Sequence, residues 1–347
     1  MVWKLFSKLW LIVMFSAKFN LLKPFSRLVK KQQLETLNYI YKAQPFCDVI
    51  SKNQNTYNLD TIYRGQPFVG TPNNYIKTIP ITGVNHPDVD YWLYKIALYG
   101  GTASSTTISA LNTFCNSIDT AGLRNKFIRL NLFCGNNLNA CLVPLYGDIT
   151  DINFNNNFNS SDYNETGSNG GLKGDGLSKG LITGVSTSII PTAFHLSTYV
   201  SIPNTTISLG YDIGGTNSDS NDHRIGLTNI LFPSPSYTFA CFQLINTPYI
   251  ATSNVAGFYI GNCLTTTGQL YRNGVSVAIG TNTGNNRIPS NYPLMIFGGS
   301  QSGSNSMRNF STARLNAYSA GFSMTNAEAS TFNTIMQIFQ TALNRNV

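Results

Sequence analysis

Two stretches in the first half of the chain repeat their apolar residues at the spacing of an α-helix. The first, residues 88–99, stops at Gly100 and Gly101, and the second, residues 104–121, stops at Gly122. Their apolar faces consist of Trp92, Ile96 and Tyr99 in the first stretch and Ile108, Leu111, Phe114 and Ile118 in the second. The strongly apolar residues 125–145 predict a buried strand or helix that seats this small helical unit on its neighbour.

From Gly147 onward the pattern changes to short β-branched and aromatic runs separated by Gly, Asn, Ser and Pro. Asn273-Gly274 is typical of the two-residue turn of a β-hairpin, here within residues 269–277. The other clear runs are residues 194–202, 206–212, 237–244, 257–262 and 294–297. This pattern predicts a β-sandwich or jelly roll.

The last predicted element is a helix. Thr325 and Glu328 have the spacing of a capping box, which marks the start of a helix. The apolar face that follows consists of Phe332, Ile335, Phe339 and Ala342 or Leu343, and the helix ends near the basic Arg345.

Composition adds a neutral, hydrogen-bonding surface to this picture. Hydrophobic residues make up 42% of the 347 positions, which is enough for a core, whereas only 11% are charged. The net charge of +8 is concentrated in the first 31 residues, where seven basic residues precede the first acidic one, Glu35. The rest of the chain lacks the basic stripe of a nucleic-acid-binding protein, so we expect no nucleic-acid partner.

Residues 1–32 are a basic and hydrophobic leader. The apolar run of residues 9–15 is much shorter than the ~20 residues that cross a bilayer. Lys4, Lys8 and Lys18 share one strip of a helix, which predicts docking or membrane-surface contact by residues 1–31. A secretory signal peptide, and a misassigned start or disordered leader, are the alternatives.

Ten residues of the chain occur almost twice, as residues 37–46 and residues 59–68. Both copies contain the motif Tyr-x-x-Gln-Pro-Phe, formed by Tyr41, Gln44, Pro45 and Phe46 and by Tyr63, Gln66, Pro67 and Phe68. Each copy has too little apolar surface to order itself. We therefore expect residues 33–75 to be an extended segment with two assembly anchors that pack on neighbouring subunits.

Three catalytic motifs are candidates, and the sequence satisfies none of them. Residues 317–321 resemble a nucleophile elbow, but no His follows Ser319, as the hydrolase order requires. Glu165 is the only Glu of the β region before the last helix, so a strand with paired glycosidase carboxylates is missing. The Gly-rich residues 167–180 do not have the spacing of a phosphate-binding loop. We therefore expect a protein that is not an enzyme.

The six cysteines show neither a CxxC pair nor a Cys/His pair at zinc spacing. Cys115 and Cys134 lie in apolar runs, where we expect buried free thiols. No cofactor is expected apart from a candidate calcium ion. Its ligands would be oxygens of Asp212, Asn217, Asp219 and Asp222 in a Gly-rich loop, although the loop lacks a closing Glu and a solvated acidic loop is the alternative.

Four tyrosines are candidates for a glycan-binding platform. Sugar sites on β-sandwiches combine an aromatic ring with Asn, Asp and Gly of loops, and Tyr211, Tyr249, Tyr259 and Tyr271 lie in or near predicted loops. A host surface glycan is therefore a candidate partner.

Short motifs in the second half give the chain a family resemblance. They are Leu-Tyr-Arg-Asn-Gly-Val at residues 270–275, Pro-Leu-Met-Ile-Phe-Gly-Gly at residues 293–299, and residues 313–325 before the last helix. The chain resembles the concanavalin-like (laminin-G-like) jelly rolls of tailed-phage structural proteins. Residues 90–183 resemble the segment that often precedes such a domain, and the repeat resembles short motifs of the same proteins. The resemblance covers roughly residues 37–347 and carries over no catalytic residue.

These observations together predict a mainly β chain of four parts. Residues 1–32 are the leader, 33–75 the repeat segment, 76–145 the small helical unit, and 146–347 a concanavalin-like jelly roll that ends in a helix. The resemblance implies a non-enzymatic virion protein, associated with capsid or tail, that forms homo-oligomers and binds other virion proteins. A receptor-binding adhesin or lectin for host glycans is the alternative, and a secreted glycan-active enzyme is a third interpretation.

Overall fold

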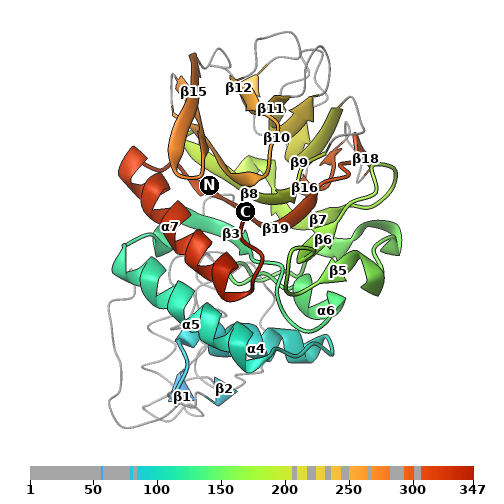
Figure 1. Ribbon diagram of the computed structural model, residues 1–347, viewed down its shortest axis with the longest axis vertical. Helices are drawn as coiled ribbons and strands as arrows, with labels where there is room; N and C mark the ends of the chain where they lie inside the picture. Colours follow the sequence, from blue (N-terminus) through green and yellow to red (C-terminus); the bar gives the residue numbers. More distant parts are fainter. Residues whose placement is uncertain are drawn as a thin grey trace, which may run out of the picture. The chain divides into compact units, whose positions relative to one another are not determined.

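The computed structural model describes residues 56–57, 79–80, 84–204, 209–216, 224–230, 236–243, 250–264, 267–281, 293–300 and 306–347. All of them belong to one compact unit, Gln54–Ile62 with Pro72–Val347. The predictions for residues 1–32 and for the eight anchor residues lie outside the described residues. The predicted fold class is confirmed, because the unit is mainly β with antiparallel sheets in a β-sandwich (Figure 1).

One sheet of the sandwich has seven strands in the described part of the chain. Its order is β12-β11-β10-β9-β16-β7-β4, and every neighbouring pair is antiparallel. The strands are β4 (Ile152–Asn153), β7 (Leu181–Ser186), β9 (Leu209–Thr216), β10 (Arg224–Ile230), β11 (Ser236–Gln243), β12 (Ile250–Ser253) and β16 (Pro293–Ile296).

The second sheet has eight strands among the described residues, in the order β15-β14-β13-β8-β19-β6-β5, with β3 also paired to β19. They are β3 (Phe127–Asn131), β5 (Tyr163–Asn164), β6 (Gly171–Lys173), β8 (Phe194–Ile202), β13 (Gly257–Cys263), β14 (Thr267–Arg272), β15 (Val275–Thr281) and β19 (Arg314–Phe322). The predicted hairpin is β14–β15, with positive φ at Asn273 and Gly274 as its turn requires. Two short pairs, β1 (Thr56–Tyr57) with β2 (Ile79–Pro80) and β17 (Gly299–Ser300) with β18 (Met307–Arg308), are also antiparallel.

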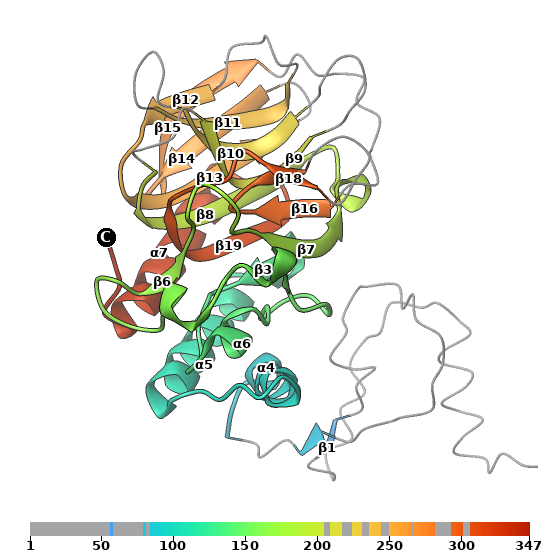
Figure 2. The ribbon, with the colours of Figure 1, turned by 90° about the vertical axis from the view of Figure 1, so that its right-hand side faces the viewer.

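Helices form a third layer, on the side of the eight-stranded sheet away from the other sheet (Figure 2). They are α4 (Pro87–Leu98), α5 (Ser105–Thr120) and α7 (Asn326–Ala342), with the short α6 (Leu138–Cys141). Short 3-10 helices occupy Arg124–Lys126, Phe154–Asn156, Ser160–Asp162 and Thr187–Ile189. Among the helices that the structure describes, none combines the length and the apolar character needed to span a bilayer.

Caps fix where these helices begin. The side chain of Ser104 accepts a hydrogen bond from the backbone N–H of Thr107 at the start of α5. The predicted capping box of Thr325 and Glu328 is confirmed, with both reciprocal hydrogen bonds present at the start of α7.

The eight-stranded sheet separates two hydrophobic cores, because neighbouring residues of a strand point to opposite faces. On β8, Phe194 and Leu196 belong to the core between the two sheets. Tyr199, on the same strand, belongs to the core between the sheet and the helices, together with Trp92 of α4 and Phe332 of α7. The helices therefore share a core with the sandwich, and β3 pairs with the late strand β19.

Candidate functional site

Strand β19 brings Ser319 into contact with a histidine that lies far upstream in the chain. The antiparallel register of β8 and β19 sets Ser197 opposite Ser319 and His195 opposite Gly321. His195 Nε2 lies 2.8 Å from Ser319 Oγ, and the two serine hydroxyls lie 2.6 Å apart. His195 Nδ1 lies 2.7 Å from the carbonyl oxygen of Phe322, which can only accept a hydrogen bond. His195 is therefore protonated at Nδ1, and Ser319 donates to Nε2.

This arrangement has the contacts of a nucleophile and its base, but both groups are buried. His195 and Ser319 are fully inaccessible, and the rings of Phe127 and Phe332 contact the imidazole edge-on, with centroids 5.7 and 6.4 Å away. Burial lowers the pKa of His195 to about 4, because the charged imidazolium is poorly solvated there. The pair therefore acts as a neutral polar link between β8 and β19. The order of residues along the chain gave no sign of it.

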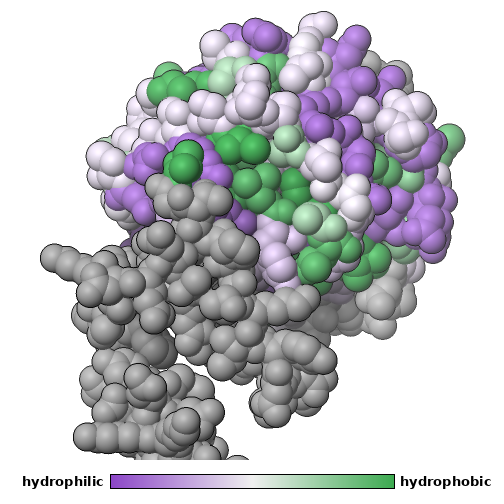
Figure 3. Space-filling view, turned by 90° about the horizontal axis from the view of Figure 1, so that it is seen from below, coloured by the Kyte–Doolittle hydropathy of each residue, from purple (hydrophilic) through white to green (hydrophobic). Residues whose placement is uncertain are grey.

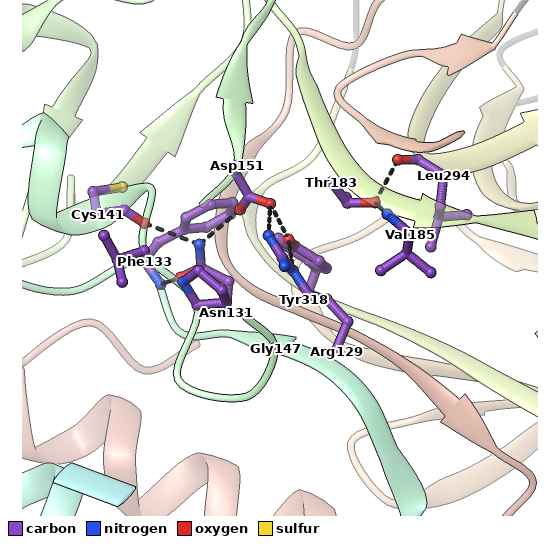
Figure 4. Close-up of polar contacts among 12 residues, drawn as sticks. Arg129, Asn131, Phe133, Cys141, Gly147, Asp151, Thr183, Val185, Leu294 and Tyr318 are labelled. Atoms are coloured by element: carbon purple, nitrogen blue, oxygen red, sulfur yellow. Dashed lines mark hydrogen bonds and ion pairs between the residues drawn. The ribbon is translucent and has the colours of Figure 1, made fainter. Parts of the chain in front are cut away.

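A second polar cluster, drawn in Figure 4, lies around Tyr318 on the same strand. The guanidinium of Arg129 donates to Asp151 through Nη2 and to the Tyr318 hydroxyl through Nε, at 3.1 Å. The hydroxyl of Tyr318 donates to Asp151 at 2.6 Å. Asn131 donates to the other oxygen of Asp151 at 2.8 Å and accepts from the backbone N–H of Phe133.

The charged and polar side chains of this cluster are paired with one another. Arg129 and Asp151 are 1% and 0% exposed, so neither charge is solvated by water. Burial alone would lower the pKa of Arg129, but Tyr318 and Asp151 outweigh this effect and raise it. The Cβ that a side chain would add at Gly147 lies only 2.9 Å from Arg129 Cδ, so that glycine leaves space for the guanidinium arm. The cluster binds β3, β19 and the segment before β4 together.

Arg345 forms a third buried contact at the end of the chain. Its guanidinium donates to the carbonyl oxygens of Leu132 at 2.6 Å and Phe133 at 2.8 Å, and to the side-chain oxygen of Gln340 at 2.6 Å. Burial lowers the pKa of Arg345. The charged group is thus solvated by carbonyl oxygens in place of water, and it holds the residues after α7 against β3.

The predicted calcium ligands are not brought together by the described residues. Asp212 lies within β9, fully buried, and accepts hydrogen bonds from Tyr237 at 3.0 Å and Ser311 at 2.6 Å. For Asp212, the predicted Gly-rich loop and its alternative, a solvated acidic loop, are therefore both wrong. Asn217, Asp219 and Asp222 lie outside the described residues, so their part of the prediction is unchanged.

Three of the four tyrosines predicted to form a glycan-binding platform lie in strands. Tyr211, Tyr259 and Tyr271 lie in β9, β13 and β14 and are at most 1% exposed, so the expectation that they line surface loops is corrected. The hydroxyl of Tyr271 donates at 2.7 Å to Gln269, and the ring of Tyr259 stacks on Tyr237 with centroids 3.9 Å apart. Tyr249 lies outside the described residues.

A different aromatic surface occurs at the carboxyl end of α4. The side chain of Tyr99 is 51% exposed, beside Leu98 at 58%. Asn139 Nδ2 donates to the carbonyl oxygen of Tyr99 at 3.0 Å, and Asn137 Nδ2 donates to that of Gly100 at 3.0 Å. We call Tyr99, Asn136, Asn137 and Asn139 the tyrosine–amide rim. Figure 3 shows hydrophobic and polar side chains side by side on the face of the molecule seen from below.

The helical spacing places Tyr99 on the apolar face of residues 88–99, so the sequence predicts a buried ring there and not an exposed one. Gly100 has a φ of +71° and ends α4, so the residue before it lies where the helix turns outward. The Asn-rich sequence of residues 136–139 was a usable signal, since amides near a helix end form caps or solvent-facing groups.

Comparison with known proteins finds similar solved structures but no family. No protein-family model matches the chain, and no curated protein sequence matches it. The sialidase of Trypanosoma rangeli, solved with a difluoro-KDN ligand, is similar with a TM-score of 0.44 and 13% identity. That match covers 65% of this chain but only 38% of the sialidase, so the chain spans less than half of that protein.

Two smaller solved domains are similar over nearly their whole length. Domain 4 of AbnA, a GH43 extracellular arabinanase from Geobacillus stearothermophilus in complex with arabinotriose, matches with a TM-score of 0.37 and 13% identity, covering 60% of this chain and 98% of that domain. The CBM40 of the Ruminococcus gnavus IT-sialidase, bound to α2,6 sialyllactose, matches with a TM-score of 0.32 and 10% identity, over 46% and 96%. The named neighbours are carbohydrate-binding or sialidase proteins, and no phage protein is among them.

The expectation that the chain is not an enzyme is corrected by these comparisons. Several of the similar structures are of T. rangeli sialidase, and one of these is a mutant that displays trans-sialidase activity. At 10–13% identity and a TM-score of at most 0.44, the likeness to the sialidase transfers no catalytic residue to this chain.

Proposed function

We propose that this protein binds carbohydrate, and that the tyrosine–amide rim is its binding surface. The observation that carries the proposal is the half-exposed Tyr99 at the end of α4, where three asparagine side chains donate hydrogen bonds to Tyr99, Gly100 and Thr102. The C–H face of a sugar packs well on an aromatic ring, and planar amides both donate to and accept from its hydroxyls. An uncharged surface suits such a ligand, and only 11% of the residues are charged.

The arrangement of the asparagines supports a rigid site. Asn137 Nδ2 and Asn139 Nδ2 donate to the backbone of the loop after α4, and Asn136 Nδ2 donates to Thr102 Oγ1 at 3.0 Å. These contacts orient the amides before any ligand arrives, which lowers the entropy lost on binding. Asn136 and Asn139 are exposed, so their amides lie at the surface, where a sugar could reach them.

A glycan array followed by titration calorimetry with the best glycan tests this function on the full chain. Replacing Tyr99 with Ala should weaken binding at least tenfold, because stacking on the ring is lost. Leu98→Ala is the matched control, since Leu98 is as exposed and apolar but not aromatic, and it should change affinity less than twofold. Silence of the array, or equal binding by Tyr99→Ala with an unchanged melting temperature, contradicts the proposal.

The repeat favours a second candidate function, that of a structural protein of a tailed-phage virion. Two copies of Tyr-x-x-Gln-Pro-Phe, 22 residues apart, suit an extended segment anchored on neighbouring subunits, including further copies of this chain. The location would then be the virion particle. Mass spectrometry of purified particles tests this function, and particles that contain no copy of the chain exclude it.

A further inference from the structure

The start of α4 and the middle of α5 bring three potential metal ligands together. His86 caps α4, Asp88 lies in its first turn, and Cys115 lies in α5. One ligand atom from each of the three residues lies within 4.8 Å of the other two, and His86 Nδ1 is 3.9 Å from Asp88 Oδ2. Nitrogen, oxygen and sulfur together form a ligand set that zinc accepts. The spacing of these residues in the sequence gave no indication of the cluster.

The hydrogen bonds of His86 already orient its ring for this role. The backbone N–H of Asp88 donates to Nδ1 at 3.1 Å, so Nδ1 carries a lone pair. The proton is therefore on Nε2, which donates to Asp119 Oδ2 at 3.1 Å. Metal-binding histidines usually donate their second nitrogen to a carboxylate in this way, which fixes the tautomer and strengthens the ligand. Asp119 is thus a second observation, independent of the three ligands, that fits a metal.

The charges around the cluster would be balanced with a zinc ion bound. Arg124 Nε donates to Asp88 Oδ2 at 3.1 Å, and its guanidinium lies 3.7 Å above the ring of Tyr146. With zinc bound and the Cys115 thiol deprotonated, the two positive charges of zinc and that of Arg124 are balanced by the thiolate and the carboxylates of Asp88 and Asp119. The side chains of His86 and Asp88 are 11% and 12% exposed, which leaves a path for the ion, whereas Cys115 is buried.

We propose that His86 Nδ1, Asp88 and Cys115 bind one zinc ion, with water as the fourth ligand. On binding, the Cys115 thiol releases its proton to solvent and the Asp88 N–H gives up its contact with Nδ1. The ion then joins α4 to α5.

Calorimetric titration of the full chain with zinc, after treatment with a chelator, tests the site. One equivalent should bind, and Cys115→Ser should weaken binding at least tenfold. Cys134→Ser is the matched control, because Cys134 is also a buried free thiol but belongs to no such ligand cluster among the residues that the structure describes, and it should bind zinc as the unmodified chain does. Cobalt in place of zinc should give a thiolate charge-transfer band that Cys115→Ser abolishes.

Asp119→Asn provides a test that does not depend on a buried substitution. The Asp119 side chain is 51% exposed, so folding should be unaffected, yet loss of its charge beside Nε2 should weaken zinc about tenfold or more. Zinc should also raise the melting temperature of the unmodified chain and of Cys134→Ser. The proposal is overturned if the chain binds no stoichiometric zinc, or if Cys115→Ser and Asp119→Asn bind zinc as tightly as the unmodified chain.

Discussion

The two faces of strand β19 carry two buried polar clusters of opposite character. Tyr318 belongs to the core between the sheets and joins the ion pair of Arg129 and Asp151. The next residue, Ser319, faces the helices and joins the neutral pair of His195 and Ser197. Both clusters are fully buried, but one contains two full charges and the other none.

This difference shows how the protein solvates polar groups without water. In the ionic cluster, each charge is stabilised chiefly by its partner, so removal of either charge leaves the other unsolvated in an apolar core. In the neutral cluster, each group needs only a hydrogen bond of the correct direction, and the backbone carbonyl of Phe322 sets that direction. The ionic cluster should therefore tolerate substitution less than the neutral one.

The largest effect is expected from Arg129→Met, which leaves the Asp151 carboxylate buried without its cation. We expect a loss of about 3–5 kcal/mol in the free energy of unfolding, measured by urea denaturation at pH 7. Arg272→Met is the matched control, because Arg272 donates to Ser253 in an exposed contact, and it should cost no more than about 0.5 kcal/mol. Equal losses in the two variants would show that the buried ion pair contributes no more to stability than an exposed contact.

A smaller effect is expected from acid, acting on the neutral cluster. The pKa of His195 is about 4 in the folded protein and about 6.5 in an unfolded chain. Below pH 6.5 the unfolded chain therefore takes up a proton that the folded protein does not, and stability falls until about pH 4. The full contribution is about 3 kcal/mol.

Urea denaturation of the unmodified chain and of His195→Gln at pH 7 and pH 4.5 measures this contribution. Glutamine does not titrate, so the variant should lose less stability over this pH range than the unmodified chain. Identical pH dependence of the two proteins would show that folding does not lower the pKa of His195.

The smallest effect is expected from Ser319→Ala, which removes one donor from His195 Nε2 without exposing a charge. A buried acceptor left without its partner costs about 1–2 kcal/mol, well below the loss for Arg129→Met. Ser330→Ala, on the exposed face of α7, should be neutral in the same denaturation experiment. A loss for Ser319→Ala as large as that for Arg129→Met would contradict the comparison.

Much of the local structure follows from the sequence. The run at residues 194–202 is β8, Asn273-Gly274 forms the predicted turn, and the helix after Thr325 begins where its capping box places it. These features depend on residues close together in the chain, through side-chain alternation and helix capping. The burial of Tyr211 and Tyr271, which lie in or near predicted loops, does not follow from the sequence, because a polar neighbourhood in sequence does not reveal which residues the tertiary structure covers.

The tertiary structure alone decided which polar groups meet. Ser319 and His195 are 124 positions apart, and Arg129 and Tyr318 are 189 apart. They are neighbours because β8 and β3 pair with β19 in one register, and a shift of one residue would turn every side chain to the opposite face. The sequence by itself determined the sandwich, its strands and its capped helices, since these follow from short-range periodicity. The buried clusters and the tyrosine–amide rim arise only where distant strands and helices come together.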